Sequence, residues 1–167
     1  MAGELKVPGF SSYLHPAADG LLLGLGRNAD EAGRITGLQL SLFDVSRPSR
    51  PVRVDAEAID LGGAYSNSAA EYDHHAFAYF PEQQVVAVPV DAYNFEGAGS
   101  HRVVVFKVSR EQGLVPLGEV SLNENASRTL RIGGILYVVS QNSVKAVSID
   151  DPTVEVGLLD LRDKSES

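Results

Sequence analysis

The order of apolar and polar residues along the chain predicts short β-strands separated by tight turns. Residues 38–45 read Leu-Gln-Leu-Ser-Leu-Phe-Asp-Val, so three leucines share one face of an extended chain. Because Phe43 and Val45 make the opposite face apolar as well, we expect this strand to be covered on both sides, as in stacked sheets. Pro48 and Pro51 follow shortly afterwards and lack the N–H that a sheet needs, so the chain is expected to reverse there.

The same succession of strands and turns recurs twice downstream. The turn motif Phe-Asp-Val-Ser at 43–46 returns as Phe-Lys-Val-Ser at 106–109 and as Val-Ser-Ile-Asp at 147–150. Repeated four-stranded units spaced by roughly 40 to 65 residues are typical of propeller blades. A twelve-stranded sandwich is the alternative, but it does not require the turn motif to recur at the same strand of each unit. The predicted strands are 11–14, 21–27, 35–45 and 52–61; 73–80, 85–90, 101–108 and 113–122; and 127–132, 134–139, 143–149 and 154–161.

These strands predict one all-β, β-propeller-type domain over residues 11–161, built of about three four-stranded antiparallel blades. The predicted parts are an N-terminal extension at 1–10, blades at about 11–61, 73–122 and 127–161, a linker at 62–70 and a C-terminal tail at 162–167. The chain has 167 residues, of which 44% are hydrophobic, and this is enough for one ordinary core.

The amino-acid composition excludes several classes of partner and chemistry. The formal net charge of −8 repels phosphate backbones, so we expect no nucleic-acid binding. The chain has no cysteine, and therefore no disulfide or thiolate chemistry. The apolar runs are far shorter than the roughly 20 residues that a membrane-spanning helix needs, so we predict no membrane span. Residues 1–9 lack a basic segment followed by an apolar run, so no secretory signal is expected there.

Several motifs resemble the C-terminal part of the secreted proteins with a β-propeller domain distantly related to WD40 repeats. They are Tyr-Leu-His-Pro at 13–16, Gly-Leu-Gly-Arg at 24–27 with Ala-Asp at 29–30, Gly-Leu-Gln-Leu-Ser-Leu-Phe-Asp-Val-Ser at 37–46, Glu-Tyr-Asp-His-His-Ala-Phe at 71–77 and Arg-Ile-Gly-Gly-Ile-Leu-Tyr-Val-Val-Ser at 131–140. The resemblance implies a propeller fold and no established activity. It implies an extracellular or cell-envelope location if the chain is part of a longer secreted protein.

Three blades fall short of the four to eight that close a propeller ring. Bare blade faces and strand edges invite association. The chain is therefore expected either to be an excised piece or to self-associate. We favour a dimer in which two copies make six blades, with the first blade of each copy packed on the third blade of the other.

The cluster Asp73-His74-His75 is the first candidate for chemistry. Neighbouring residues on a strand point to opposite faces, so His74 and His75 are not expected to share a metal, whereas Asp73 and His75 can share a face. A structural hydrogen-bonding role is favoured, since carboxylate–histidine pairs also occur in inert cores. If the protein is an enzyme, Asp73, His75 and His101 are its candidate acid–base or metal groups at the central channel.

The loop at 28–33 partly matches a calcium-binding loop through Asp30 and Glu31. Ala32 stands at the fifth position and Gln39 at the twelfth, where a bidentate Glu is required. We therefore interpret the segment as a hairpin loop in which Asp30 and Glu31 could hold at most a weak cation.

Tyr65, Tyr93 and Phe95 are the candidate partner-binding residues, because aromatic side chains among small polar ones suit binding surfaces. The alternative is that Tyr65 and Phe95 fill the space between blades. The sequence favours a non-catalytic binding and assembly module, which needs no cofactor and whose ligand is a protein or a glycan. The alternative function is an enzyme with an Asp/His site.

Overall fold

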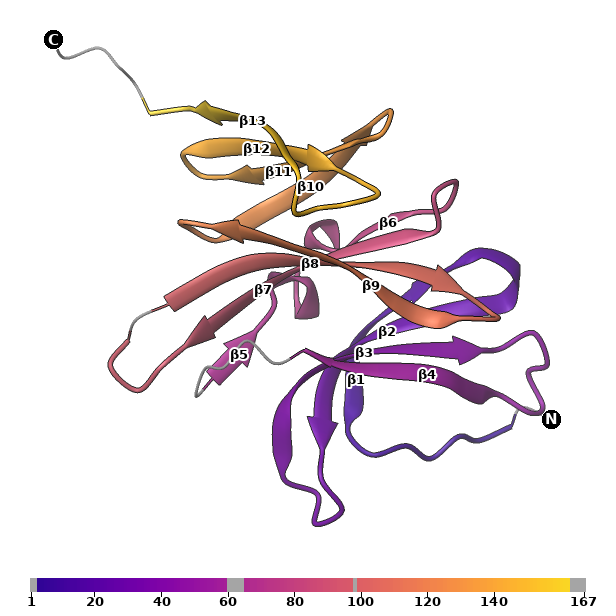
Figure 1. Cartoon of the computed structure of the whole chain (residues 1–167). Coiled ribbons are helices and arrows are strands. Elements are labelled where there is room, and N and C mark those ends of the chain that lie inside the picture. Colours follow the sequence, from indigo (N-terminus) through magenta and orange to yellow (C-terminus); the bar gives the residue numbers. More distant parts are fainter. Residues whose placement is uncertain (1–2, 60–64, 98, 163–167) are drawn as a thin grey trace, which may run out of the picture.

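The computed structural model describes residues 3–59, 65–97 and 99–162, which form three antiparallel β-sheets stacked face to face (Figure 1). The all-β architecture confirms the predicted fold class. Sheet A contains β1 (Phe10–Pro16), β2 (Leu21–Ala29), β3 (Ile35–Asp44) and β4 (Val52–Ile59). Sheet B contains β5 (Tyr65–Asn67), β6 (Ala78–Phe80), β7 (Val85–Tyr93), β8 (Gly99–Ser109) and β9 (Gly113–Leu122). Sheet C contains β10 (Ala126–Ile132), β11 (Ile135–Ser140), β12 (Ser143–Ser148) and β13 (Glu155–Asp160).

Sheets A and B share the first core. Leu38, Leu40 and Leu42 are fully buried, and they pack with leucines of β2 against the valines of β7 and β8. The predicted apolar face of β3 is therefore confirmed. Within one chain, no second sheet covers the opposite face among the described residues, so cover on that side stays a prediction. Phe43 instead lies across Gly24 of its own sheet, where an added Cβ would come within 2.9 Å of the Phe43 ring.

Sheets B and C share the second core. β7 reads Val-Val-Ala-Val-Pro-Val, and alternate residues enter different cores because side chains alternate along a strand. Val86, Val88 and Val90 face sheet A, whereas Val85 and Ala87 face sheet C. The middle sheet is thus covered on both faces, as the continuous apolar run predicts.

The inner strand of sheet B differs from the predicted one. A strand over 73–80 is wrong for its first half, because η3 (His74–Ala76) is a 3-10 turn and only β6 is extended. Part of the predicted linker is also wrong, since β5 pairs with β7 and is followed by the 3-10 turn η2 (Ala69–Glu71). A third such turn, η1 (Ala18–Gly20), precedes β2. Residues 1–2 of the predicted extension, 60–64 between the first two sheets and 163–167 of the tail lie outside the described residues.

Within the described part of the chain, no helix has the length and apolar character needed to cross a membrane.

Candidate functional site

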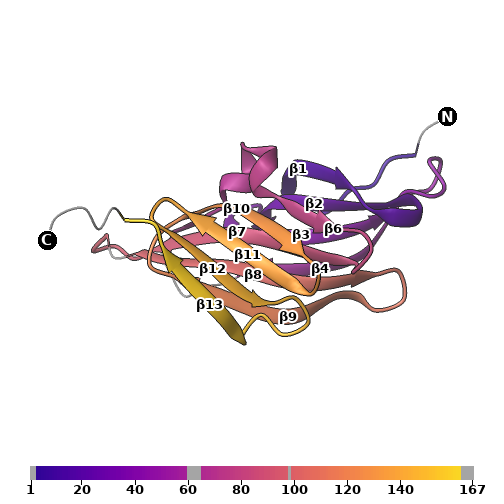
Figure 2. The ribbon, with the colours of Figure 1, turned by 90° about the horizontal axis from the view of Figure 1, so that it is seen from above.

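The turns η2 and η3 lie on one side of the stack, together with β1, β6 and β10 (Figure 2). η2 contacts β1 and β2, and η3 contacts β10. We call this side, formed by β1, β6, β10 and the two turns, the first-strand edge. It brings together the first strands of sheets A and C with the short β6 of sheet B, and it holds the predicted candidates Asp73 and His75 together with His74.

Glu71 ties η2 to sheet A. Its Oε2 accepts from Arg27 Nη2 at 2.6 Å, and its Oε1 accepts from the Ser12 hydroxyl at 3.3 Å. Ser68 caps the same turn: its buried hydroxyl accepts from the Ala70 amide and donates to the Pro89 carbonyl. The Arg27–Glu71 pair is largely shielded from solvent, so it fixes the position of the turn more firmly than an exposed pair would.

Asp73 ties η3 to sheet C. Its Oδ1 accepts from the His75 amide at 3.0 Å and lies 3.2 Å from His75 Nδ1, while Arg128 Nη1 of β10 donates to Oδ2 at 3.0 Å. The bond from the His75 amide is the main reason that the pKa of Asp73 lies below its usual value. A carboxylate that bonds the backbone two residues ahead favours a turn over a sheet ladder, which explains why the predicted strand does not form here.

The expectation that His74 and His75 point to opposite faces is wrong, because η3 is a 3-10 turn and not a strand. Their ring centroids lie 3.8 Å apart, and one donor atom from each of Asp73, His74 and His75 lies within 4.8 Å of the others. Among the described residues, this is the group of three His and Asp or Glu side chains whose ligand atoms lie close enough to share one metal ion.

His101 does not join that group. It lies opposite Asp91 on β7 and β8, and its Nδ1 is 2.7 Å from Asp91 Oδ1 in a largely buried pair. The Tyr93 ring contacts the His101 ring edge-on, with centroids 6.0 Å apart. The structure therefore splits the three predicted acid–base residues into an exposed turn with Asp73 and His75 and a cross-strand pair with His101.

Asp30 holds the β2–β3 hairpin loop together. Its Oδ1 accepts from the amides of Ala32 and Arg34, each at 2.9 Å, and its Oδ2 accepts from Arg34 Nε at 2.8 Å. The bond from the Arg34 amide is the largest cause of the lowered pKa of Asp30. Both carboxylate oxygens of Asp30 therefore already bond this hairpin loop, and a weak cation at Asp30 and Glu31 stays a prediction.

Tyr65 and Phe95 form an exposed aromatic pair. Their side chains are 64% and 87% exposed, and their rings meet edge-on with centroids 6.0 Å apart. They therefore do not fill the space between sheets. Tyr93 lies opposite Tyr65 across the paired strands β5 and β7, is half-buried and contacts His101. A role for these three residues in partner binding stays a prediction.

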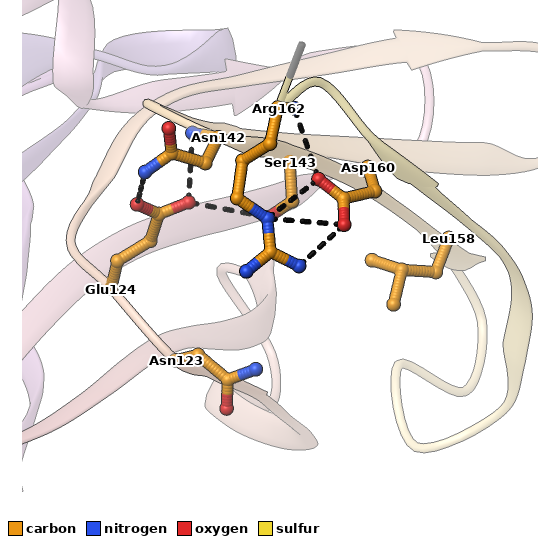
Figure 3. A pocket seen from close by; sticks show the side chains of 7 residues that line it. All are labelled: Asn123, Glu124, Asn142, Ser143, Leu158, Asp160 and Arg162. Carbon is orange, nitrogen blue, oxygen red and sulfur yellow. Dashed lines mark hydrogen bonds and ion pairs between the residues drawn. The ribbon is translucent and has the colours of Figure 1, made fainter. Parts of the chain in front are cut away.

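A polar cavity of about 280 Å³ at the end of sheet C was not predicted from the sequence (Figure 3). Glu124 accepts from the backbone and side-chain amides of Asn142, at 2.9 and 2.8 Å, and Asp160 pairs with Arg162. These groups mainly bind one another. The cavity is lined by Asn123, Glu124, Asn142, Ser143, Leu158, Asp160 and Arg162.

The face of sheet C that points away from sheet B is apolar and bare. Leu136 and Val138 of β11 enter the second core, so their neighbours on the same strand point outward. Leu130, Ile132 and Leu159 on that outward side are 54%, 70% and 59% exposed. The strand register places these residues next to one another, so they form one patch, which we call the outer face of sheet C. It contains Leu130, Ile132, Ile135, Tyr137, Val139, Val144, Ala146 and Leu159.

The outward face of sheet A combines small and polar residues with three larger apolar side chains, Leu14, Leu22 and Phe43. Gly24 and Gly26 lie there opposite Ser41 and Gln39. Gln39 donates to Asn28 at 3.1 Å and accepts from the Ser41 hydroxyl at 3.2 Å, so the centre of the face carries a chain of side-chain hydrogen bonds. We call this surface, formed by Leu14, Leu22, Gly24, Gly26, Asn28, Gln39, Ser41, Phe43, Ala56 and Ala58, the outer face of sheet A.

Comparison with known proteins identifies two archaeal relatives, both described as uncharacterized. One, from Methanocaldococcus jannaschii, is 33% identical over 138 residues, which cover 83% of this chain and 19% of the relative. The other, from Archaeoglobus fulgidus, is 30% identical over 162 residues, which cover 97% of this chain and 22% of the relative. The chain thus spans about a fifth of the length of these relatives. No solved structure matches significantly. The β-propeller domain family matches residues 1–152, and the chain belongs to that family.

Proposed function

We propose that the protein is a non-catalytic propeller module that assembles with a second copy of itself, the outer face of sheet C of each copy packing on the outer face of sheet A of the other. The observation that carries the proposal is the contiguous bare patch on sheet C, with Leu130, Ile132 and Leu159 more than half exposed. Large apolar patches of this kind mark interaction sites in soluble proteins.

The two cores inside the chain support this pairing. In the first core, leucines of sheet A meet mostly smaller valines of sheet B, together with Phe106 and Leu114. In the second core, the small Ala87 and Val105 of sheet B meet Leu136 of sheet C and Ile149, which follows β12. Large side chains on one sheet thus fit against small ones on the next, as close packing requires. The outer faces offer part of the same combination. Sheet C presents Leu, Ile and Tyr side chains, and sheet A presents Gly, Ser and Ala residues beside the larger Leu14, Leu22 and Phe43.

Symmetry favours a dimer. The interface joins two different faces, so it generates a ring if the rotation closes and a filament if it does not. Two copies of three blades give six, which is within the four to eight of closed propellers. A ring also leaves neither outer face in water, whereas an open stack always leaves two.

Sedimentation equilibrium at micromolar concentration tests the proposal. The wild-type chain is expected to be a dimer, and Leu130→Asp is expected to be a monomer with an unchanged circular dichroism spectrum, because Leu130 is outside both cores. Phe95→Asp is the matched control, since it adds the same charge at an exposed apolar residue away from the two outer faces. A wild-type monomer, or equal dissociation of both variants, would overturn the dimer.

A second proposed role is contact with a protein or glycan ligand through Tyr65 and Phe95. The support is their edge-on contact and high exposure, because rigid aromatic rings supply contact area at low entropic cost. In a screen against glycans and proteins, the double variant Tyr65→Ala/Phe95→Ala is expected to lose a ligand that wild type and Tyr72→Ala retain. Tyr72 is 80% exposed and serves as the control. Loss in Tyr72→Ala alone would contradict this role.

A further inference from the structure

We propose that Asp73, His74 and His75 form a surface site for a divalent transition-metal ion of the Zn²⁺ type. This site is independent of the proposed dimer, because it rests on η3 rather than on the two outer faces. Asp73 Oδ1 and a ring nitrogen of each histidine are the ligand atoms, and water completes the coordination.

Two of the ligand atoms already have the separation that a metal requires. Zn–N and Zn–O bonds of about 2.0–2.1 Å in a tetrahedral arrangement place neighbouring ligand atoms about 3.3 Å apart. Asp73 Oδ1 and His75 Nδ1 are 3.2 Å apart. A metal ion can therefore replace the proton between these two atoms without a movement of the backbone, and the displaced proton passes to solvent.

The third ligand needs only a side-chain adjustment. His74 lies against His75 with ring centroids 3.8 Å apart, and the three donor atoms lie within 4.8 Å of one another. Both histidines are exposed, so a rotation of the His74 side chain meets little packing resistance. The 3-10 backbone brings the two adjacent rings to the same side, which an extended strand would prevent.

Arg128 positions the carboxylate for this role. It donates to Asp73 Oδ2 at 3.0 Å, on the oxygen that the histidines do not use. Hydrogen bonds to the non-ligating oxygen of a ligating carboxylate orient that carboxylate and are a usual part of metal sites. The His75 amide adds a second bond to Asp73, so the side chain is already held in its turn conformation before any ion binds.

The donor set selects the class of metal. Two imidazoles and one carboxylate suit Zn²⁺, Cu²⁺, Ni²⁺ and Fe²⁺, whereas Ca²⁺ and Mg²⁺ prefer all-oxygen sites with more ligands. Three protein ligands leave at least one position open to water, as in zinc sites that keep an exchangeable ligand. Zn²⁺ is therefore the probe of choice, with Co²⁺ as its spectroscopic substitute.

Isothermal titration of the full chain with ZnCl₂ tests the proposal. Wild type is expected to bind one Zn²⁺ per chain, and Co²⁺ is expected to give visible absorption bands of a site with nitrogen ligands. His74→Ala/His75→Ala and Asp73→Asn are each expected to weaken Zn²⁺ binding by at least about tenfold. Asn can still accept the turn hydrogen bond, so Asp73→Asn removes the charge while keeping the cap.

His15→Gln is the matched control, because His15 is a histidine on the first-strand edge that lies outside η3, where it contacts Tyr13 and Phe77. It is expected to bind Zn²⁺ as wild type does. Thermal melts monitored by circular dichroism establish that each variant is folded. The proposal is overturned if folded wild type binds no Zn²⁺, if the double histidine variant binds as tightly as wild type, or if equimolar Ca²⁺ displaces the ion.

Discussion

Sheet A and sheet C both end the stack, yet their outward faces differ in chemistry. On sheet A, Gly24 and Gly26 let neighbouring groups approach closely, and Gln39 bonds the side chains of Asn28 and Ser41. On sheet C, the corresponding surface consists of branched and aromatic side chains with few polar groups. On sheet A the polar groups of the outer face therefore already bond one another, whereas the outer face of sheet C gains much more free energy from burial against a partner.

The two faces of sheet C provide the prediction with the largest expected effect. Leu136→Ala removes a fully buried side chain from the core with sheet B, so it is expected to lower the free energy of unfolding by about 2–5 kcal/mol. Leu130→Ala, at a half-exposed residue of the outer face, is expected to change monomer stability by less than about 0.5 kcal/mol.

Urea denaturation measured in the monomeric Leu130→Asp background separates fold stability from assembly. Leu136→Ala is compared with its parent in that background, and Leu130→Ala is compared with wild type at protein concentrations low enough for both to be monomeric. Similar unfolding midpoints for Leu136→Ala and its parent would mean that sheet C does not share a core with sheet B.

A glycine in each of the two end sheets gives the second prediction. An added Cβ at Gly26 would lie 2.0 Å from the Phe10 carbonyl oxygen, so Gly26→Ala must displace β1 from β2. We expect a loss of about 1–3 kcal/mol of unfolding free energy. Gly157→Ala on β13 meets no atom within 4 Å and is the control, with an expected change within about 0.5 kcal/mol. Thermal and urea melts of the two variants that coincide would refute the close approach on sheet A.

Most of the fold could be predicted from hydrophobic patterning. The leucines at 38, 40 and 42 and the apolar run of β7 identify strands with buried faces, and the proline turn after β3 places a reversal where the structure has one. These features are local consequences of period-two alternation and proline chemistry. The prediction of a strand over 73–80 was wrong for its first half because Asp73 accepts a hydrogen bond from the His75 amide. This bond favours a turn over sheet pairing, and an apolar pattern does not reveal it.

The candidate site was harder to predict because its geometry depends on residues distant in sequence. Asp73 meets Arg128 and Glu71 meets Arg27 only after the sheets have stacked. The Asp-His-His motif was visible, but its arrangement required knowing that the backbone turns there. The Asp-x-His spacing, in which the carboxylate can cap the amide two residues ahead, is the sequence signal that could have indicated a turn.

The hydrogen-bonded centre of the outer face of sheet A gives a smaller expected effect. Gln39→Ala removes the acceptor of the buried Ser41 hydroxyl and the donor to Asn28, and is expected to cost roughly 1 kcal/mol of unfolding free energy. The double variant Gln39→Ala/Ser41→Ala removes the orphaned hydroxyl and should recover part of that loss. An equal or larger loss in the double variant would indicate that Ser41 contributes through packing rather than through its bond to Gln39.

Ionic strength is expected to change assembly the least, but it distinguishes an apolar contact from a charged one. Each copy carries a formal net charge of −8, so two copies repel each other, and salt screens that repulsion. Raising NaCl from about 0.05 M to about 0.5 M is therefore expected to tighten the wild-type dimer a few-fold, as measured by sedimentation equilibrium. The Phe95→Asp variant adds charge away from the outer faces and should show a slightly steeper dependence. If salt instead loosened the dimer, ion pairs rather than the leucines and isoleucines of sheet C would be joining the two copies.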